Sequence, residues 1–172
     1  QERSQIAFRR YTEMEFDRIY AEVDLGRIEE NMKAMKEHLR PGTKMYGVVK
    51  TDAYGHGAVP VARTIDRFVC GYAVATVDEG LKLRRHGIEK EILCLGPVSA
   101  GRYQECLEND ISLPMFEYRR AKELSDAAVA EGKTAKIHIA VDTGMSRIGL
   151  FPDEGSVETV KEIAELPALR IA

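Results

Sequence analysis

A lysine stands directly after a short apolar run, where a charge is unusual. Lys50 follows Met45 to Val49, which has the composition of a buried strand, and a buried ammonium is costly unless its pKa falls or it reacts. At the carboxyl end of a barrel strand, the amine would lie in a desolvated pocket that favours its neutral, nucleophilic form. The structural alternative is an ion pair with a carboxylate such as Asp52.

The residues after Lys50 could bring backbone close to a ligand. Tyr54-Gly55-His56-Gly57 places two glycines around a histidine just before an expected helix, and glycine allows the close approach that a bound anion needs. The Tyr54 hydroxyl could then reach a phosphate. Alternatively, this is a strand-to-helix turn that needs positive φ, with Tyr54 covering the core edge and His56 bound to backbone.

A second polar cluster, Val141 to Gly149, also follows an expected strand. Arg147 has a fixed fork of donors that could bind a cofactor oxygen or a substrate carboxylate. The alternative is that Asp142 and Arg147 brace one another across the loop.

Alternating strands and helices must position these clusters. Five apolar runs predict strands, at Met45 to Val49, Gly71 to Ala75, Ile92 to Leu95, Ile111 to Pro114 and Ala135 to Val141. Amphipathic stretches between them predict helices, at Ala58 to Arg67, Val77 to His86, Arg102 to Glu108, Glu117 to Glu131 and Ser156 to Glu165. This repetition predicts an α/β fold with a parallel sheet, either a (β/α)8 TIM-type barrel or a doubly wound sheet.

The two ends of the chain carry further expectations. Residues 1–18 form a charge-dense N-terminal extension, Ile19 to Val23 alternates as a strand should, and a helix from Leu25 to Leu39 is capped by Asp24. Leu169 to Ala172 begins a sixth strand after about five β-α units. We therefore expect residues 19–172 to be the N-terminal part of a barrel that continues beyond Ala172, because an open barrel exposes sheet edges.

Composition excludes several classes of function. The 172 residues are 44% hydrophobic, with a formal charge of -3 and no basic patch for nucleic acid or an anionic membrane. No apolar run is long enough for a membrane span, and no signal peptide is visible. The three cysteines lack the spacing of a zinc site or a disulfide framework. We therefore expect no metal, and we expect a cytoplasmic location.

Two long motifs resemble the signatures of the alanine racemases. Residues 48–57, Val-Val-Lys-Thr-Asp-Ala-Tyr-Gly-His-Gly, resemble the cofactor-lysine signature of that family. Residues 142–149, Asp-Thr-Gly-Met-Ser-Arg-Ile-Gly, resemble its second signature. The resemblance runs from about Tyr20 to the end of the chain. It implies a fold type III enzyme that depends on pyridoxal 5'-phosphate.

The resemblance assigns a role to each matching residue. Lys50 would hold the cofactor as an internal aldimine and then serve as the base on the D-side of the substrate. Tyr54 would bind the cofactor phosphate, and Leu95 would pack near its ring. Arg147 would donate to the phenolic oxygen and lie near the substrate carboxylate, with Met145 lining the site. Many relatives carry a carbamylated lysine seven residues before this arginine, where Ala140 stands here.

The resemblance also implies a reaction and an assembly. The enzyme would racemise L- and D-alanine, supplying D-alanine for cell-wall peptidoglycan, as a homodimer whose partner contributes a tyrosine base from a C-terminal β-domain. That domain is absent from these 172 residues, so we expect the chain alone to bind cofactor poorly and racemise negligibly. The alternatives are a serine or broad-specificity racemase, or a non-catalytic barrel protein that binds pyridoxal phosphate.

Overall fold

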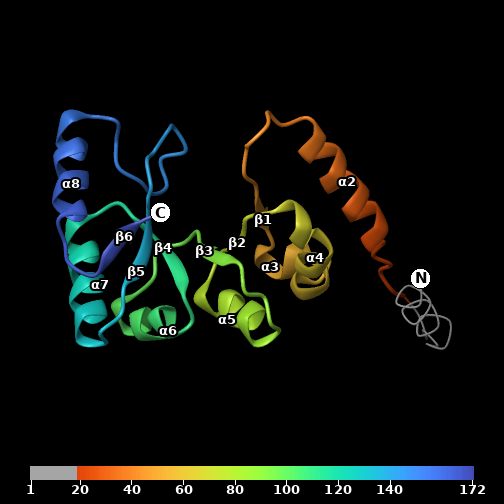
Figure 1. Cartoon of the computed structure of the whole chain (residues 1–172), viewed down its shortest axis with the longest axis horizontal. Helices are drawn as coiled ribbons and strands as arrows, with labels where there is room; N and C mark the ends of the chain where they lie inside the picture. The colour runs from red at the N-terminus through yellow and green to blue at the C-terminus, as the bar shows by residue number, and fades with distance from the viewer. Residues whose placement is uncertain (1–18) are drawn as a thin grey trace.

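A single parallel sheet forms the centre of the computed structural model, which describes residues 19–172. Its strands lie side by side in chain order, from β1 to β6 (Figure 1). They are β1 (Tyr46–Val48), β2 (Gly71–Val74), β3 (Glu91–Cys94), β4 (Ile111–Met115), β5 (Ala135–Ile139) and β6 (Leu169–Ile171). A doubly wound sheet runs outward in two directions from its first strand, whereas a barrel keeps chain order. The prediction of a partial TIM-type barrel is confirmed.

Helices alternate with the strands along the chain. They are α2 (Leu25–Glu37), α3 (Lys50–Tyr54), α4 (Ala58–Ile65), α5 (Val77–Arg85), α6 (Tyr103–Glu108), α7 (Tyr118–Ala130) and α8 (Glu154–Ala164), with 3-10 turns η1 (Asp66–Phe68) and η2 (Ala100–Arg102). The predicted helices are therefore present, most of them within one or two residues of the expected ends. α3 is an addition that periodicity did not indicate.

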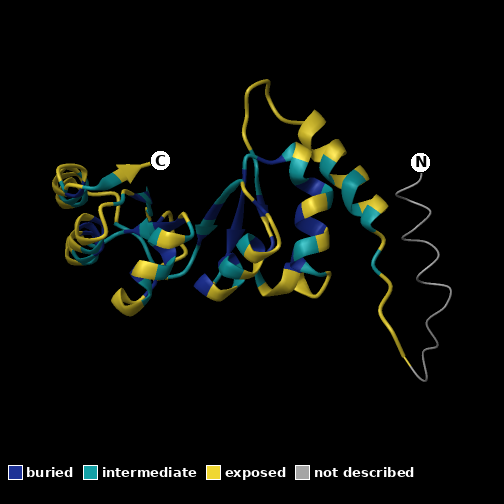
Figure 2. Ribbon diagram, turned by 60° about the horizontal axis from the view of Figure 1, so that its bottom comes forward, coloured by how far each residue is buried: buried dark blue, intermediate teal, exposed yellow. Residues whose placement is uncertain are grey.

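The core lies between the sheet and the helices. A Cβ atom on Gly47 of β1 would meet the side chains of Ile65 and Val69, so this position faces the helical layer. On β2, the buried Tyr72 hydroxyl donates to the Ala62 carbonyl of α4 at 2.7 Å. Figure 2 shows buried residues concentrated in the strands and on the sides of the helices that face them. Tyr46, the neighbour of Gly47, consequently points to the opposite face of the sheet, here called the inner face.

Two helices begin at the residues that sequence patterns indicate. The Asp24 carboxylate accepts the Arg27 N–H at 3.1 Å, which confirms Asp24 as the cap of α2. Thr76 and Glu79 form a reciprocal capping box at the start of α5. These caps fix where each helix begins, and the second of them contributes directly to the candidate site described below.

The strand predicted at Ile19 to Val23 is wrong. This segment has no regular structure, and the Ile19 side chain is 87% exposed. Apolar alternation supports a strand only where a neighbouring strand satisfies its backbone groups. Every strand of the described sheet lies elsewhere, from Tyr46 onward, so this segment is not part of the sheet.

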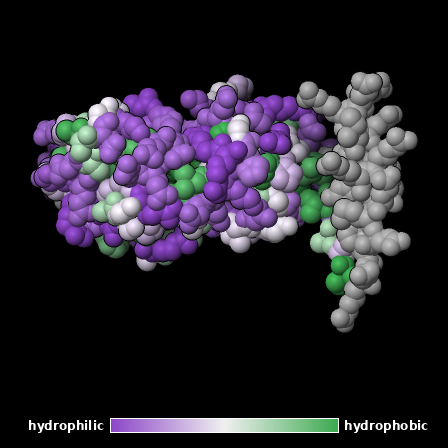
Figure 3. All heavy atoms as spheres, turned by 90° about the horizontal axis from the view of Figure 1, so that it is seen from below, coloured by the Kyte–Doolittle hydropathy of each residue, from purple (hydrophilic) through white to green (hydrophobic). Residues whose placement is uncertain are grey.

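The surface of the described region is mostly polar. Figure 3 shows one face on which hydrophilic residues predominate and hydrophobic areas are small. Among residues 19–172, no helix is long and apolar enough to cross a membrane. The predicted N-terminal extension, residues 1–18, lies outside the described residues.

Candidate active site at the carboxyl ends of the strands

Lys50 opens a turn of left-handed helix. The four residues that follow it, 51–54, all have φ between 52° and 55°, so α3 is left-handed over this stretch, here called the left-handed turn. Such a conformation costs an L-residue about 1–2 kcal/mol. Backbone strain of this kind persists only where surrounding contacts hold it, and it is concentrated at functional sites.

Asp52 anchors the left-handed turn from within. Its Oδ1 accepts the Ala58 N–H at 2.9 Å and a hydrogen bond from Lys82 Nζ at 2.8 Å. These two contacts hold the pKa of the Asp52 carboxyl below its usual value. The predicted alternative, in which Lys50 forms an ion pair with Asp52, is therefore wrong, because Asp52 binds Lys82 instead.

Within residues 19–172, the Lys50 amine has no carboxylate partner. Lys50 is half-buried, and no acidic side chain within residues 19–172 contacts its Nζ, which lies 5.8 Å from the centroid of the Tyr54 ring. Tyr54 is 62% exposed, so the alternative in which it covers the core edge is wrong. The alternative for His56 is confirmed, since its Nδ1 lies 2.9 Å from the Ala53 carbonyl. A primary amine and a phenol thus lie together, both accessible.

A glutamate that the predicted site did not include connects the two strand ends. Glu79 Oε1 accepts the Thr51 N–H at 2.7 Å, and Oε2 accepts the N–H groups of Ala75 at 2.7 Å and Thr76 at 3.3 Å. The spacing from Thr76 to Glu79 indicates a helix cap in the sequence. The contact with Thr51 spans 28 positions, and no local pattern indicates it.

The second signature forms a closed loop after β5. Its base is fixed by the Asp142 N–H, which donates to the Leu150 carbonyl at 2.8 Å. The Asp142 carboxylate, which is buried, accepts the N–H groups of Ser146 and Gly144 at 2.9 Å each, and these bonds lower the pKa of Asp142. The predicted alternative of an Asp142–Arg147 brace is wrong, because Asp142 binds backbone groups of its own loop.

The remaining predicted site residues lie apart from Lys50. Arg147 and Met145 are exposed in the loop after β5, and no ion pair or side-chain hydrogen bond involves Arg147 in the described part of the chain. Leu95 directly follows β3, and its N–H donates to the Val74 carbonyl at 2.7 Å. Three strands separate β1 from β5 in the sheet, and α3 and this loop lie well apart (Figure 1). Among residues 19–172, contacts join only Lys50 and Tyr54 of the predicted set.

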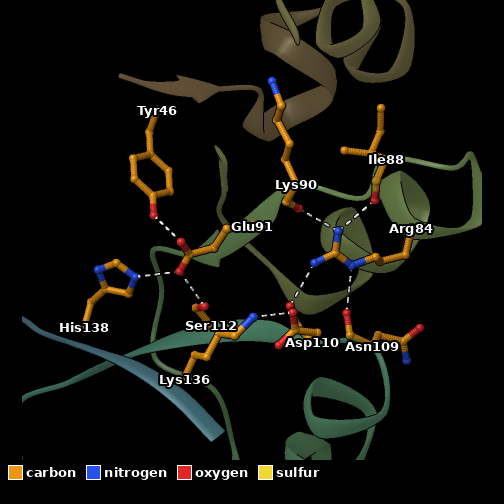
Figure 4. Close-up of polar contacts among 10 residues, drawn as sticks. All are labelled: Tyr46, Arg84, Ile88, Lys90, Glu91, Asn109, Asp110, Ser112, Lys136 and His138. Atoms are coloured by element: carbon orange, nitrogen blue, oxygen red, sulfur yellow. Dashed lines mark hydrogen bonds and ion pairs between the residues drawn. The ribbon is translucent and has the colours of Figure 1, made fainter. Parts of the chain in front are cut away.

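Beneath the strand ends, the inner face carries a half-buried polar cluster around Glu91. The Glu91 carboxylate accepts hydrogen bonds from the Tyr46 hydroxyl at 2.6 Å and the Ser112 hydroxyl at 2.9 Å, and it lies 3.0 Å from His138 Nε2 (Figure 4). Burial alone would raise the pKa of Glu91, but these partners outweigh it and lower the pKa to about 2. The cluster joins β1, β3, β4 and β5.

An arginine ties together the backbone at the amino ends of β3 and β4. Arg84 donates to the carbonyl groups of Asn109, Ile88, Lys90 and Asp110 at 2.7–2.9 Å (Figure 4). Burial lowers the pKa of its guanidinium. In β/α barrels the amino ends of the strands serve stability and the carboxyl ends carry the chemistry. We therefore assign Arg84 to the framework and place the candidate site around Lys50.

Comparisons with known proteins identify the family of this chain. The family model for the N-terminal domain of alanine racemase matches residues 23–172. An alanine racemase of Clostridium novyi (strain NT) is 46% identical over 154 residues, which cover 89% of this chain and 40% of that protein. The chain thus spans about two-fifths of the length of the curated relatives it matches.

Solved structures give the same result. An alanine racemase of Clostridium difficile 630 superposes with a TM-score of 0.78 at 34% identity, covering 84% of this chain and 38% of that one. A histidine racemase of Leuconostoc mesenteroides subsp. sake NBRC 102480 reaches a TM-score of 0.76 at 26% identity, over 84% of this chain and 39% of that one. Closely similar barrel portions therefore occur in racemases named for different amino acids.

Proposed function

The chain belongs to the alanine racemase family, and on that premise we propose that Lys50 is the cofactor lysine of an enzyme that interconverts L-alanine and D-alanine. One observation carries the proposal. Lys50 lies at the carboxyl end of the first barrel strand, next to Tyr54, and no carboxylate within residues 19–172 neutralises it. A lysine placed there for stability would be expected to have an acidic partner.

The residues present fit pyridoxal 5'-phosphate. The aldehyde of this cofactor requires a primary amine outside an ion pair, which Lys50 provides. Its phosphate requires donors, and the exposed Tyr54 hydroxyl lies on the same turn. At Gly55, the space that a Cβ would enter is empty, so a ligand can approach the backbone there. When bound, the cofactor supplies an electron sink that makes the α-proton of an amino acid removable at neutral pH.

Each residue has a defined task in the proposed reaction. Lys50 holds the cofactor through Nζ and, once released, exchanges a proton with one side of the substrate. Tyr54 donates its hydroxyl proton to a phosphate oxygen, and Leu95 packs against the cofactor ring. Arg147 orients carboxylate or phenolic oxygens with its fork of donors, and Met145 lines the site. Ala140 leaves Arg147 without the anionic group that many relatives provide.

The remaining parts of the proposal concern the whole enzyme. We assign the second base to a tyrosine of a partner subunit in a homodimer, and we assign the D-alanine formed to cell-wall peptidoglycan. By itself, the chain would then load cofactor weakly and racemise negligibly. Serine is a second candidate substrate. Histidine is a third, because a histidine racemase shares this barrel portion.

Covalent labelling tests the assignment of Lys50. The chain is incubated with pyridoxal 5'-phosphate, reduced with borohydride, digested and mapped by mass spectrometry. We expect the pyridoxyl group on Lys50, and its loss from this peptide in Lys50→Arg but not in Lys44→Arg, a nearby exposed lysine. Label spread over surface lysines with Lys50 unmodified would contradict the proposal. Formation of D-alanine, D-serine or D-histidine by an enzyme containing this domain then identifies the substrate.

A further inference from the structure

Helix α5 places two charged side chains on the left-handed turn. Glu79 and Lys82 are three residues apart and so lie on one side of the helix. Glu79 accepts the Thr51 N–H at 2.7 Å, and Lys82 Nζ donates to Asp52 Oδ1 at 2.8 Å. The first two residues after Lys50 are therefore both held from α5, by an acceptor and a donor.

The Glu79 carboxylate uses both of its oxygens. One accepts from Thr51 in the turn after β1, and the other accepts from Ala75 and Thr76 at the end of β2. Hydrogen bonds to an ionised acceptor are about twice as strong as neutral ones. Glu79 thus links the turn after Lys50 to the end of β2, in addition to capping its own helix.

The left-handed turn needs such support. Four consecutive L-residues in this conformation are unfavourable together, because the Cβ of each crowds the following carbonyl oxygen. Backbone bonds within the turn, such as Ala53 N–H to the Val49 carbonyl at 2.9 Å, offset part of this cost. A relaxed, right-handed turn would send the chain after Lys50 in a different direction and would separate the amine from Tyr54.

We propose that Glu79, assisted by Lys82, is a positioning residue that holds the left-handed turn so that Lys50 and Tyr54 present their amine and hydroxyl to the same ligand. This inference rests on the proposed function, because it concerns the attachment of the cofactor to Lys50. Neither side chain contacts Lys50 or Tyr54, so their effect passes through the backbone of residues 51–54.

A structural role alone would predict a different result. If Glu79 served only as a helix cap, its loss would lower global stability and leave the turn unaffected. Glu79→Gln separates the two roles. The amide keeps the size of the side chain and one acceptor oxygen, but it cannot accept hydrogen bonds from both strand ends. Asp153→Ala is the matched control, because Asp153 caps α8 through the Ser156 N–H at 2.7 Å and lies outside the turn.

The test uses two measurements on the 172-residue chain. Amide hydrogen exchange of the peptide covering residues 49–58 reports the turn without any cofactor. Borohydride trapping at a fixed, subsaturating concentration of pyridoxal 5'-phosphate reports attachment to Lys50. We expect Glu79→Gln to accelerate exchange in this peptide, and to reduce trapping at Lys50, by about tenfold each. Lys82→Met should act in the same direction by about threefold, since its ion pair is exposed.

The outcomes separate this inference from the function on which it rests. Asp153→Ala should lose stability without accelerating exchange in residues 49–58. If it accelerates that peptide as much as Glu79→Gln does, or if Glu79→Gln leaves the peptide unchanged, the positioning role is wrong. If an enzyme containing this domain shows no pyridoxyl group on Lys50, the proposed function fails, whereas exchange still decides whether Glu79 holds the turn. Lys82→Met supplies the same test should Glu79→Gln fail to fold.

Discussion

Individual charged residues in this domain find partners far along the chain. Asp52 binds Lys82 and Glu79 binds the Thr51 backbone, while Lys50 has no acidic partner in the described region. On the inner face, the Glu91 carboxylate has partners on three other strands. A carboxylate that accepts hydrogen bonds from such partners is stabilised in its charged form. Such groups make the stability of the fold depend on pH.

Glu91 should make the domain sensitive to acid. Its pKa is about 2 in the folded chain, against 4.5 for an ordinary glutamate. A lowered pKa stabilises the fold fully only at pH values where the group is ionised in both the folded and the unfolded chain. The contribution, about 3 kcal/mol, is therefore complete above pH 4.5 and is lost as the pH falls towards 2. Urea titrations of wild type and Glu91→Gln across this interval measure it.

Two variants, Glu91→Gln and a control on the surface, test this prediction. Glu91→Gln should be less stable than wild type at neutral pH, and the difference should shrink as the pH falls from 4.5 towards 2. The exposed Glu162→Gln should match wild type at every pH within about 0.5 kcal/mol. A difference between wild type and Glu91→Gln that stays constant with pH would contradict the assigned role of Glu91.

Among the elements, α3 departs furthest from local preference. Its residues 51–54 are left-handed although none of them is glycine. They connect Lys50, which lies just after β1, to α4. Local propensity alone would not select this geometry. Hydrogen bonds from α5 and from the backbone hold it, so the element depends on tertiary contacts for its handedness. Replacing one of these residues by glycine should therefore raise the free energy of unfolding, although glycine usually lowers it.

Thr51→Gly should stabilise the domain. Thr51 is exposed, has φ of 54° and forms its hydrogen bonds through its backbone, with the N–H donating to Glu79 and the carbonyl accepting from the Gly55 N–H. Removing the β-branched side chain relieves about 1–2 kcal/mol of left-handed strain and adds about 0.5–1 kcal/mol of glycine entropy. We expect a net gain of about 1 kcal/mol in the free energy of unfolding, measured by urea titration.

Thr159→Gly is the matched substitution in a right-handed helix. Thr159 lies within α8, where replacement by glycine should destabilise the chain by about 1 kcal/mol. Opposite signs for the two variants would confirm that the turn is strained. Equal losses in both would show that Thr51 adopts its conformation without cost.

For the whole molecule, the core is continuous from the first strand to the last helix. One cluster of buried apolar residues extends from Val49 to Ile163 and includes residues of each strand from β2 to β5. Two of the three free cysteines, Cys94 and Cys106, belong to it, while Cys70 is half-buried. A continuous core is expected to unfold cooperatively.

The reactivity of the cysteines measures whether the core unfolds cooperatively. Burial raises the pKa of Cys94, and raises that of Cys106 to about 12, so both thiols should be unreactive in the folded chain because the thiolate is the nucleophile. Pulse alkylation along a urea gradient, with mass spectrometry, should give one midpoint for both residues. Cys70 should be labelled at lower urea. Two separate midpoints for Cys94 and Cys106 would show that the core is divided.

Apart from α3 and the strand expected at Ile19 to Val23, the order and type of the elements followed from the sequence alone. Apolar runs such as Gly71 to Ala75 marked strands, and the alternation with amphipathic stretches indicated the barrel class. Asp24 was identified as a cap because its hydrogen bond is local. The position of Lys50 at a strand end could be predicted for the same reason. The burial of one face of an element and the capping of a helix depend on residues that are near one another in the chain. The local sequence pattern therefore predicts both.

Only the tertiary structure decided which side chains hold the site. The left-handed turn, the pairing of Asp52 with Lys82 and the contact of Glu79 with Thr51 depend on α3 and α5 lying side by side. The strand expected at Ile19 to Val23 failed for a related reason, since a strand exists only beside a partner. Contacts between residues about 30 positions apart are set by the packing of whole elements, and local pattern carries no record of them.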